Sequence, residues 1–530
     1  MIGDNQSPPL VNYNLFTSDP VLAAALDREG AHWARPSVES FGRTLGTEQV
    51  VRLGFEANEN PPVLGAEDQV EFHPSWHELM RLSVEHGVHA LPWQCENRAG
   101  AHTARAALMF LAAQNEAGHT CPLSMTCSSV AALRHEPDVA KDWEPRIVSS
   151  TYDPTFRPAA EKSGVLIGMS MTEQQGGSDV RTNTTRADWV RNGEYLITGS
   201  KWFCSAPMND AFLILAQAPG GLTCFLLPRW TPDSQRNGFH IQRLKPKLGN
   251  RSNASAEIEF DRAWAHRIGP EGRGVPTIME MVQHTRLDCT IGSAALMRQA
   301  VVQATHHARH RVAFGKLLID QPLMCNVLAD LSLESQAATL LMMRVARAFD
   351  ARRSDAAEQA FARFATPVAK YWISKRAPAV VLEAMECLGG NGYIDDCIMP
   401  RLYREAPVNS IWEGCGNVIC LDVLRAMKKD PDVPRATLEE ARRAQGGDRS
   451  FDRFLATLET DLPNAVETTA RHVAERLALA LQASLMIRFA SNTEADAFCA
   501  TRLASNGHAF GTLPSAVSQK LAHSAVTAAL

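Results

Sequence analysis

The sequence has no large excess of charge of either sign, no long apolar run and no leader-like start. Its 530 residues carry a net charge of −5, so the chain as a whole is not suited to binding polyanions. A nucleic-acid role needs a local basic patch, or one assembled between subunits. The apolar runs at 211–219 and 222–228 are far shorter than the roughly 18 residues that cross a bilayer. The opening residues, MIGDNQSPPL, lack the basic and apolar parts of a signal peptide. These absences predict a cytoplasmic protein without a membrane span.

Metal-binding spacing is also missing. The twelve cysteines are scattered and form no CxxC pair, so they predict reduced thiols and no zinc site. Histidines 306, 307 and 310 form one tight cluster. An i, i+4 histidine pair could hold a metal, but no third ligand is nearby, and a solvated helix face is the favoured interpretation. No metal site is predicted.

Hydrophobic periodicity divides the chain into four predicted domains. Apolar residues recur at helical spacing before residue 158 and again from 271 to 427. In the second region, the long segments 275–310 and 324–349 are too apolar to be exposed as single helices, so they predict a helical bundle. A linker at 428–437 precedes a further helical stretch. The expected domains are 1–158 (helical), 159–270 (β), 271–427 (helical bundle) and 428–530 (extra helical domain).

In residues 159–270 the apolar residues no longer recur at helical spacing. Six short β-rich runs follow one another, separated by turn sequences such as RNGE and APGG. Six strands in about 110 residues without an intervening helix indicate a compact antiparallel sheet or barrel. No Gly-x-Gly-x-x-Gly motif opens a βα unit there, which disfavours a Rossmann fold.

Five motifs occur within this framework in a specific order. They are MTEQQGGSD at 171–179, KWFCS at 201–205, RVAFG at 311–315 with Gln321, GGNGY at 389–393 and IWEG at 411–414. Together they resemble the acyl-CoA dehydrogenase family of flavoproteins over roughly residues 70–427. The resemblance implies an α+β fold with an N-terminal helical domain, a middle β-barrel or sheet domain and a C-terminal four-helix bundle, here followed by an extra helical domain.

Three further segments are informative: YNLFTSDPVLAAAL near the N-terminus, NENPP at 58–62 and ADAFCATRLA at 495–504. They resemble one branch of this family, the AidB-type or alkylation-response branch, over nearly the whole chain. This resemblance implies an FAD-containing protein of the response to DNA alkylation that binds double-stranded DNA, with weak acyl-CoA dehydrogenase activity left open. The alternative is an FAD-dependent short- or branched-chain acyl-CoA dehydrogenase with no DNA role.

The family resemblance implies two sets of FAD contacts. A glycine-containing loop lets backbone N–H groups approach a ring edge or a pyrophosphate. The second set would reach the FAD of a neighbouring subunit, which implies at least a dimer and, by family habit, a homotetramer. Glu386 stands where the family has glutamine, and this carboxylate puts the cross-subunit contact in doubt. The first set is Met171, Thr172, Gly177, Ser178, Phe203 (usually tryptophan) and Ser205; the second is Arg311, Phe314, Gln321, Glu386, Gly389 and Gly390, with Trp412 and Asn417 as further cofactor contacts.

Glu413 occupies the catalytic-base position of one large subgroup of the family. Removing two hydrogens from adjacent carbons needs a carboxylate for the α-proton and a flavin for the β-hydride, and a partly desolvated carboxylate suits the first task. The resemblance implies that Arg286 faces the CoA phosphates or the nucleotide. Cys415 stands where the family has threonine, which removes one flavin hydrogen bond. Arg425 is a candidate modulator, because an arginine paired with Glu413 would depress its pKa and obstruct substrate.

The segment 428–530 carries the DNA hypothesis. Twelve basic residues balance twelve acidic ones there, and nine of the basic residues are arginine, which suits phosphate contacts. Glu467, Arg471 and Glu475 follow i, i+4 steps, the pattern of an ordinary ion-paired helix face. No helix-turn-helix or zinc module is evident, so a non-specific phosphate mode is expected.

Overall fold

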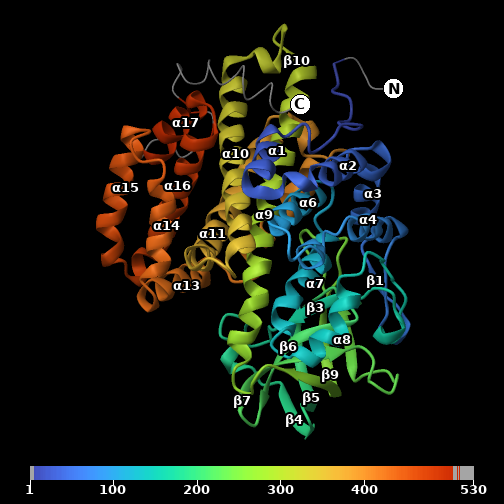
Figure 1. The fold of residues 1–530 in the computed structure, drawn as a ribbon. Helices are drawn as coiled ribbons and strands as arrows, with labels where there is room; N and C mark the ends of the chain where they lie inside the picture. Colours follow the sequence, from blue (N-terminus) through green and yellow to red (C-terminus); the bar gives the residue numbers. More distant parts are fainter. Residues whose placement is uncertain (1–4, 505–509, 511, 514–530) are drawn as a thin grey trace. The chain divides into compact units, whose positions relative to one another are not determined.

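A computed structural model of the chain describes residues 5–504, 510 and 512–513 (Figure 1). It contains two units, each held together by its own contacts. The first comprises the described residues of 1–48, 97–114 and 286–530, and the second comprises 49–96 and 115–285. This division differs from the four consecutive domains expected from the sequence, because the N-terminal helical region is shared between the two units.

The second unit is built around seven strands. Strand β6 pairs with β4 and β7, β4 pairs with β5, and β9 pairs with both β5 and β7, so five strands close a ring, with β3 on β6 and β8 on β9. The predicted barrel is confirmed, but it is not wholly antiparallel, because β3 and β4 both pair with β6 in parallel. The strands are β3 (Ile167–Ser170), β4 (Arg186–Arg191), β5 (Glu194–Ser205), β6 (Ala211–Ala218), β7 (Gly221–Pro228), β8 (Phe239–Leu244) and β9 (Ser255–Ile268).

Aromatic side chains fill the barrel. The Phe239 ring lies 5.0 Å from that of Phe212 and 5.9 Å from that of Phe260, centroid to centroid. The buried Arg229 guanidinium lies 4.5 Å from the centroid of the Phe239 ring. Strand β4 was not predicted, because among its six residues only Ala187 is buried and the apolar alternation is missing.

Helices and one small hairpin complete the second unit. Helix α7 packs against β3, and its residues are nearly all buried, which explains why its sequence shows no polar face. The helices are α3 (Glu48–Glu59), whose first residue belongs to the first unit, α4 (Pro74–Glu85), α5 (Leu91–Gln94), α7 (Thr120–Leu133) and α8 (Pro137–Ile147), and the hairpin is β1 (Val63–Leu64) with β2 (Val70–Glu71).

The first unit is helical. Helix α9 begins in residues of the second unit and continues into the first, and in Figure 1 α10, α11 and α16 lie side by side, as their contacts confirm. The helices are α1 (Pro20–Leu26), α2 (Arg35–Leu45), α6 (Ala101–Asn115), α9 (Gly274–His310), α10 (Pro322–Ala351), α11 (Ala356–Glu386), α12 (Met399–Glu405), α13 (Gly416–Lys429), α14 (Asp432–Arg442), α15 (Arg449–Asp461), α16 (Ala470–Phe489) and α17 (Asn492–Phe498).

Residues 428–504 extend the bundle and do not form a separate body. Glu440 on α14 is buried and accepts hydrogen bonds from Arg344 on α10, at 2.9 Å, and from Arg488 on α16, at 2.7 Å. Burial opposes ionisation, but the guanidiniums outweigh it and lower the pKa of Glu440 to about 2. An extra helical domain was expected here; by their contacts these helices group with the bundle, where they pack on α10 and α11. The residues from 514 onward lie outside the described part.

All twelve cysteines lie in the described part of the chain, and none forms a disulfide there. Among the described residues, no helix combines the length and the apolar character needed to cross a membrane.

We predict that Phe239→Ala lowers the free energy of unfolding by about 3–5 kcal/mol, because it removes a ring from the closed barrel and leaves a cavity. Chemical denaturation followed by circular dichroism measures this. The matched control is Trp189→Ala on β4, whose side chain is 61% exposed and whose loss should change stability by no more than about 0.5 kcal/mol. Equal losses for the two variants would contradict the assigned core.

Candidate functional site

The residue predicted to be the base lies in a left-handed turn. Glu413 has φ +59° and Gly414 has φ +102°, directly before α13. A glutamate rarely adopts this conformation, because its Cβ crowds the following carbonyl. Surrounding groups must therefore hold the turn.

Lys370 is one of the groups that hold this turn. Its ammonium donates to the Trp412 carbonyl at 3.0 Å and to the Gly414 carbonyl at 2.6 Å, so it ties together the residues on either side of Glu413. It comes from α11 and is buried, and burial lowers its pKa. Sequence reasoning missed Lys370; its only signal is a single charge within the apolar run ATPVAKYWIS.

Arg286 on α9 is the second group. Its Nε donates to the Glu413 carbonyl at 3.1 Å, and its guanidinium donates to Asp422 at 2.7 Å. Arg363 on α11 donates to the same carboxylate at 2.8 Å. Burial would raise the pKa of Asp422, but the two guanidiniums outweigh burial and hold this pKa below its usual value.

These contacts bear on two expected roles. Arg286, expected to face the CoA phosphates or the nucleotide, is buried and bound to the turn and to Asp422. Arg425, the expected modulator, is exposed on α13. The arginine that the structure places against the Glu413 backbone is Arg286, because α13 starts only at Gly416 and carries Arg425 more than two turns further along.

Three residues beside Glu413 also have defined positions. The Trp412 indole N–H donates to Asn409 at 3.0 Å. The Asn417 side chain accepts from Arg471 on α16 at 2.8 Å, so the C-terminal helices contact a predicted cofactor residue. Cys415 is exposed and precedes the first residue of α13.

The predicted flavin loop follows β3 in the second unit. Gly176 has φ +143°, and a Cβ on Gly177 would lie 2.4 Å from the Thr172 hydroxyl oxygen. Both glycines are therefore required by the path of the chain. Ser178 is exposed, and Thr172 is half-buried. The Met171 carbonyl accepts from Asn183 at 3.0 Å.

A buried ion pair anchors this loop. Lys201 on β5 donates to Glu173 at 2.7 Å, and the same carboxylate accepts from the backbone N–H groups of Thr184 and Thr185. Burial opposes ionisation of Glu173, but Lys201 and these donors outweigh it and lower its pKa to about 2. Burial lowers the pKa of Lys201 to about 8. Both residues lie within predicted motifs, but sequence reasoning gave neither a role.

Phe203 and Ser205 lie further along β5. The Phe203 side chain is 52% exposed, and the Lys245 ammonium lies 4.6 Å from its ring centroid. Ser205 is half-buried. An aromatic ring left exposed near the end of a strand is a surface available for stacking.

The second predicted set of cofactor residues lies in the first unit. The short hairpin β10 (Val312–Ala313) with β11 (Lys316–Leu317) turns at Phe314 and Gly315, both with positive φ, as a two-residue hairpin turn requires. The Phe314 side chain is 98% exposed. Gln321 donates to the Ala313 carbonyl at 3.1 Å.

A glycine turn completes this set. Gly389 and Gly390 are exposed, and a Cβ on either would meet no atom within 4 Å. Glu386, the last residue of α11, is exposed as well. The structure thus places the predicted residues in two groups: Met171, Thr172, Gly177, Ser178, Phe203 and Ser205 in the second unit, and all the others in the first.

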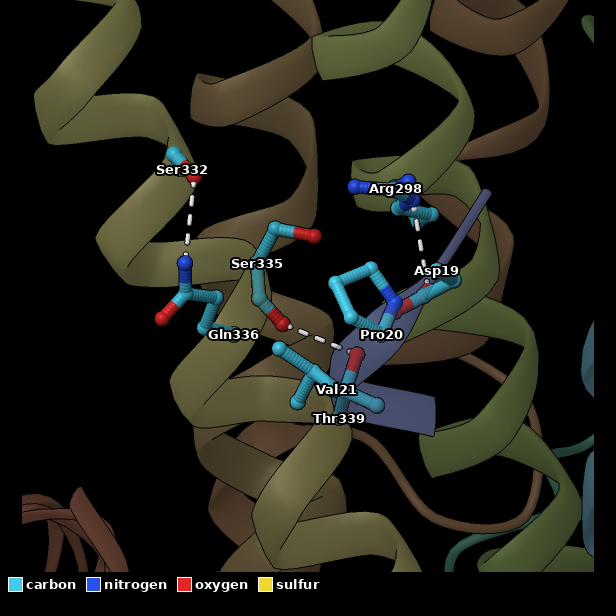
Figure 2. A pocket seen from close by; sticks show the side chains of 8 residues that line it. All are labelled: Asp19, Pro20, Val21, Arg298, Ser332, Ser335, Gln336 and Thr339. Atoms are coloured by element: carbon cyan, nitrogen blue, oxygen red, sulfur yellow. Dashed lines mark hydrogen bonds and ion pairs between the residues drawn. The ribbon is translucent and has the colours of Figure 1, made fainter. Parts of the chain in front are cut away.

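A small polar cavity elsewhere in the first unit does not resemble a substrate site. It lies where α1 meets α9 and α10 (Figure 2). Asp19 pairs with Arg298 at 3.2 Å, and Gln336 donates to Glu494 at 2.9 Å. These polar groups join helices to one another.

Comparison with known proteins agrees with this arrangement. Residues 5–154 match the family described as adaptive response protein AidB N-terminal domain, 168–263 match the acyl-CoA dehydrogenase middle domain and 272–428 the acyl-CoA dehydrogenase C-terminal domain. The chain is 46% identical to a protein of Escherichia coli (strain K12) named AidB, over 95% of this chain and 94% of that protein.

Two solved structures are similar as well. The crystal structure of Caenorhabditis elegans ACDH-11 in complex with C11-CoA has a TM-score of 0.87 and 28% identity, covering 96% of this chain and 94% of that one. An acyl-CoA dehydrogenase complexed with FAD from Bacillus anthracis has a TM-score of 0.65 and 15% identity, covering 95% of this chain and 87% of that one, and shares the fold.

We predict that Glu173→Gln and Lys201→Met each lower stability by about 3 kcal/mol, because each leaves one buried partner of the ion pair uncompensated. The double variant should recover most of this loss. The contribution of Glu173 should be present above its ordinary pKa of 4.5 and lost as the pH falls toward 2. Denaturant titrations at neutral and acidic pH measure both effects. A double variant that is no more stable than either single variant would refute the pairing.

Proposed function

The chain belongs to the acyl-CoA dehydrogenase family and to its AidB-type branch, and from that premise we propose that it holds FAD and that Glu413 is its catalytic base. The observation that carries the proposal is the left-handed turn at Glu413, which is held through backbone carbonyls by Lys370 and Arg286. These contacts use main-chain oxygens, so they hold the residue through its backbone.

The residues of the flavin loop fit the cofactor. Thr172 and Ser178 offer hydroxyls, Gly176 and Gly177 bring the backbone close, and Phe203 offers an exposed ring. Such groups suit a polar ring edge, a pyrophosphate and a flat heterocycle, respectively. The chemistry that FAD supplies when bound is the acceptance of a hydride from the β-carbon of an acyl thioester.

The protein's own part is to take the α-proton. Glu413 is half-buried, and a partly desolvated carboxylate is suited to act as a general base. The proton moves from the α-carbon to the Glu413 carboxylate, and the turn holds that carboxylate in place while it does so. An acyl-CoA is the proposed substrate class, supported by the similar nematode protein, whose crystal structure is a complex with C11-CoA.

We also propose self-association as a homotetramer. Large apolar side chains are exposed on the first unit at Phe314, Leu323, Tyr393 and Ile411, and exposed apolar surface of this kind marks an interaction site. Arg311, Phe314, Gln321, Gly389 and Gly390 would then reach the FAD of a neighbouring copy.

The second proposed role is binding of double-stranded DNA in the response to alkylation. The description of the matching N-terminal family, an adaptive response protein, supports it. Most arginines of the C-terminal helices are ion-paired within the protein, including Arg442, Arg476 and Arg488. Arg449 and Arg453, one turn apart on α15, are exposed and take part in no ion pair among the described residues, and they are the proposed phosphate contacts.

We predict that Glu413→Gln retains FAD and loses acyl-CoA dehydrogenase turnover, because the amide keeps the shape of the side chain but cannot accept the α-proton. Flavin absorbance and reduction of an artificial electron acceptor measure the two properties. Glu439→Gln, an exposed residue on α14, is the control and should leave both unchanged. Unaltered turnover in Glu413→Gln would remove this residue from the mechanism.

We predict that the double variant Arg449→Ala with Arg453→Ala weakens DNA binding and lowers the salt dependence of log K by about 2, because each arginine neutralises one phosphate. Fluorescence anisotropy with a labelled duplex at several salt concentrations measures this. Arg52→Ala with Arg81→Ala removes the same charge from helices of the second unit and serves as the control. If the wild-type protein does not bind DNA at low salt, the dehydrogenase alternative without a DNA role is favoured.

A further inference from the structure

The first residues that the structure describes lie against the β10–β11 hairpin. The Asn5 side chain both donates to the Val312 carbonyl at 2.8 Å and accepts from the Val312 N–H at 2.6 Å. Its carbonyl also accepts from Arg311 at 2.6 Å. Asn5 therefore binds β10 much as a neighbouring strand would, although the two are 307 positions apart in the sequence.

The next three residues fasten this segment at other points of the first unit. Gln6 accepts from Asn391, in the glycine turn Gly389–Gly392, at 2.9 Å. The Ser7 hydroxyl lies 2.9 Å from His307 Nδ1, and the Pro8 carbonyl lies 2.8 Å from His306 Nε2. We call residues 5–8 the N-terminal strap. It links the hairpin, the glycine turn and the last turn of α9.

The residue types suit this task. Asn5 has φ +67°, a conformation that asparagine tolerates better than other residues with a side chain. The hairpin has two residues in each strand, which is too short to be stable by itself. The Asn5 side-chain amide makes two hydrogen bonds to the backbone of Val312 on the outer edge of β10. A third strand would otherwise provide these hydrogen bonds.

The strap also orients Arg311. A guanidinium has five N–H donors, and one of them is bound to the Asn5 carbonyl. A long side chain held at one end loses rotamer freedom before any ligand arrives, so less entropy is lost on binding.

We infer that the N-terminal strap is a positioning element for the FAD of a neighbouring copy. It pre-orders Arg311 and the hairpin, and it fixes the distance between the hairpin and the glycine turn. This inference rests on the proposed function, in which these two elements reach that cofactor. Residues 5–8 bind the two elements that are proposed to contact the FAD.

The test uses the full-length holoprotein with Asn5→Ala and Gln6→Ala combined. The expected result is release of FAD about tenfold faster than from the wild type, followed as recovery of flavin fluorescence after dilution. Hydrogen exchange at the Val312 amide should accelerate as well, because that N–H loses its acceptor. The control is Asn60→Ala with Gln94→Ala, which removes the same two residue types from exposed, hydrogen-bonded positions of the second unit.

The outcomes separate the two claims. If the wild type binds FAD and the strap variant releases it within twofold of the control, the strap has no positioning role and the proposed function stands. If the wild type binds no FAD, the proposed function fails and the inference fails with it. Faster release with an unchanged Val312 exchange rate would also overturn it, because the loss would then not act through the hairpin.

Discussion

The left-handed turn at Glu413 is the constraint on which the first unit's site depends. A glutamate in this conformation has to be held, and a buried ammonium has to find acceptors. Lys370 and the turn satisfy both needs at once, since the carbonyls on either side of Glu413 accept from the lysine. The left-handed turn and the buried ammonium would each be unfavourable alone, but each stabilises the other. The conformation of the turn therefore depends on the position of α11.

Further ion pairs connect the turn to the surrounding helices. Arg286 contacts the Glu413 carbonyl and Asp422, and Arg363 returns to the same carboxylate, so α9, α11 and α13 meet in one ion network. The C-terminal helices contact α13 as well, because Arg471 on α16 donates to the Asn417 side chain. An added C-terminal segment that packs so closely on the site helices is part of the scaffold. The exposed surface of this segment lies on the outer faces of its helices. The proposed DNA contacts, Arg449 and Arg453, lie on such a face of α15.

Motifs that depend on local chemistry could be predicted from the sequence. The glycine loop after β3 follows from residue types close together in the chain. The base role of Glu413, in contrast, is implied only by the family resemblance and stays a prediction. Contacts between distant segments could not be predicted from the sequence. Neither the role of Lys370 nor the burial of Arg286 has a local signature, since each depends on which helices pack together. Strand β4 was missed because its side chains face outward and carry no apolar alternation.

The most direct test of the account is an anaerobic titration of the purified holoprotein with acyl-CoAs of increasing chain length. If Glu413 is the base, at least one acyl-CoA should bleach the oxidised flavin spectrum of the wild type. The same acyl-CoA should leave the flavin spectrum of Glu413→Gln unchanged. An oxidised spectrum that no acyl-CoA changes in the wild type would contradict the assignment of Glu413 as a base acting on this class of substrate.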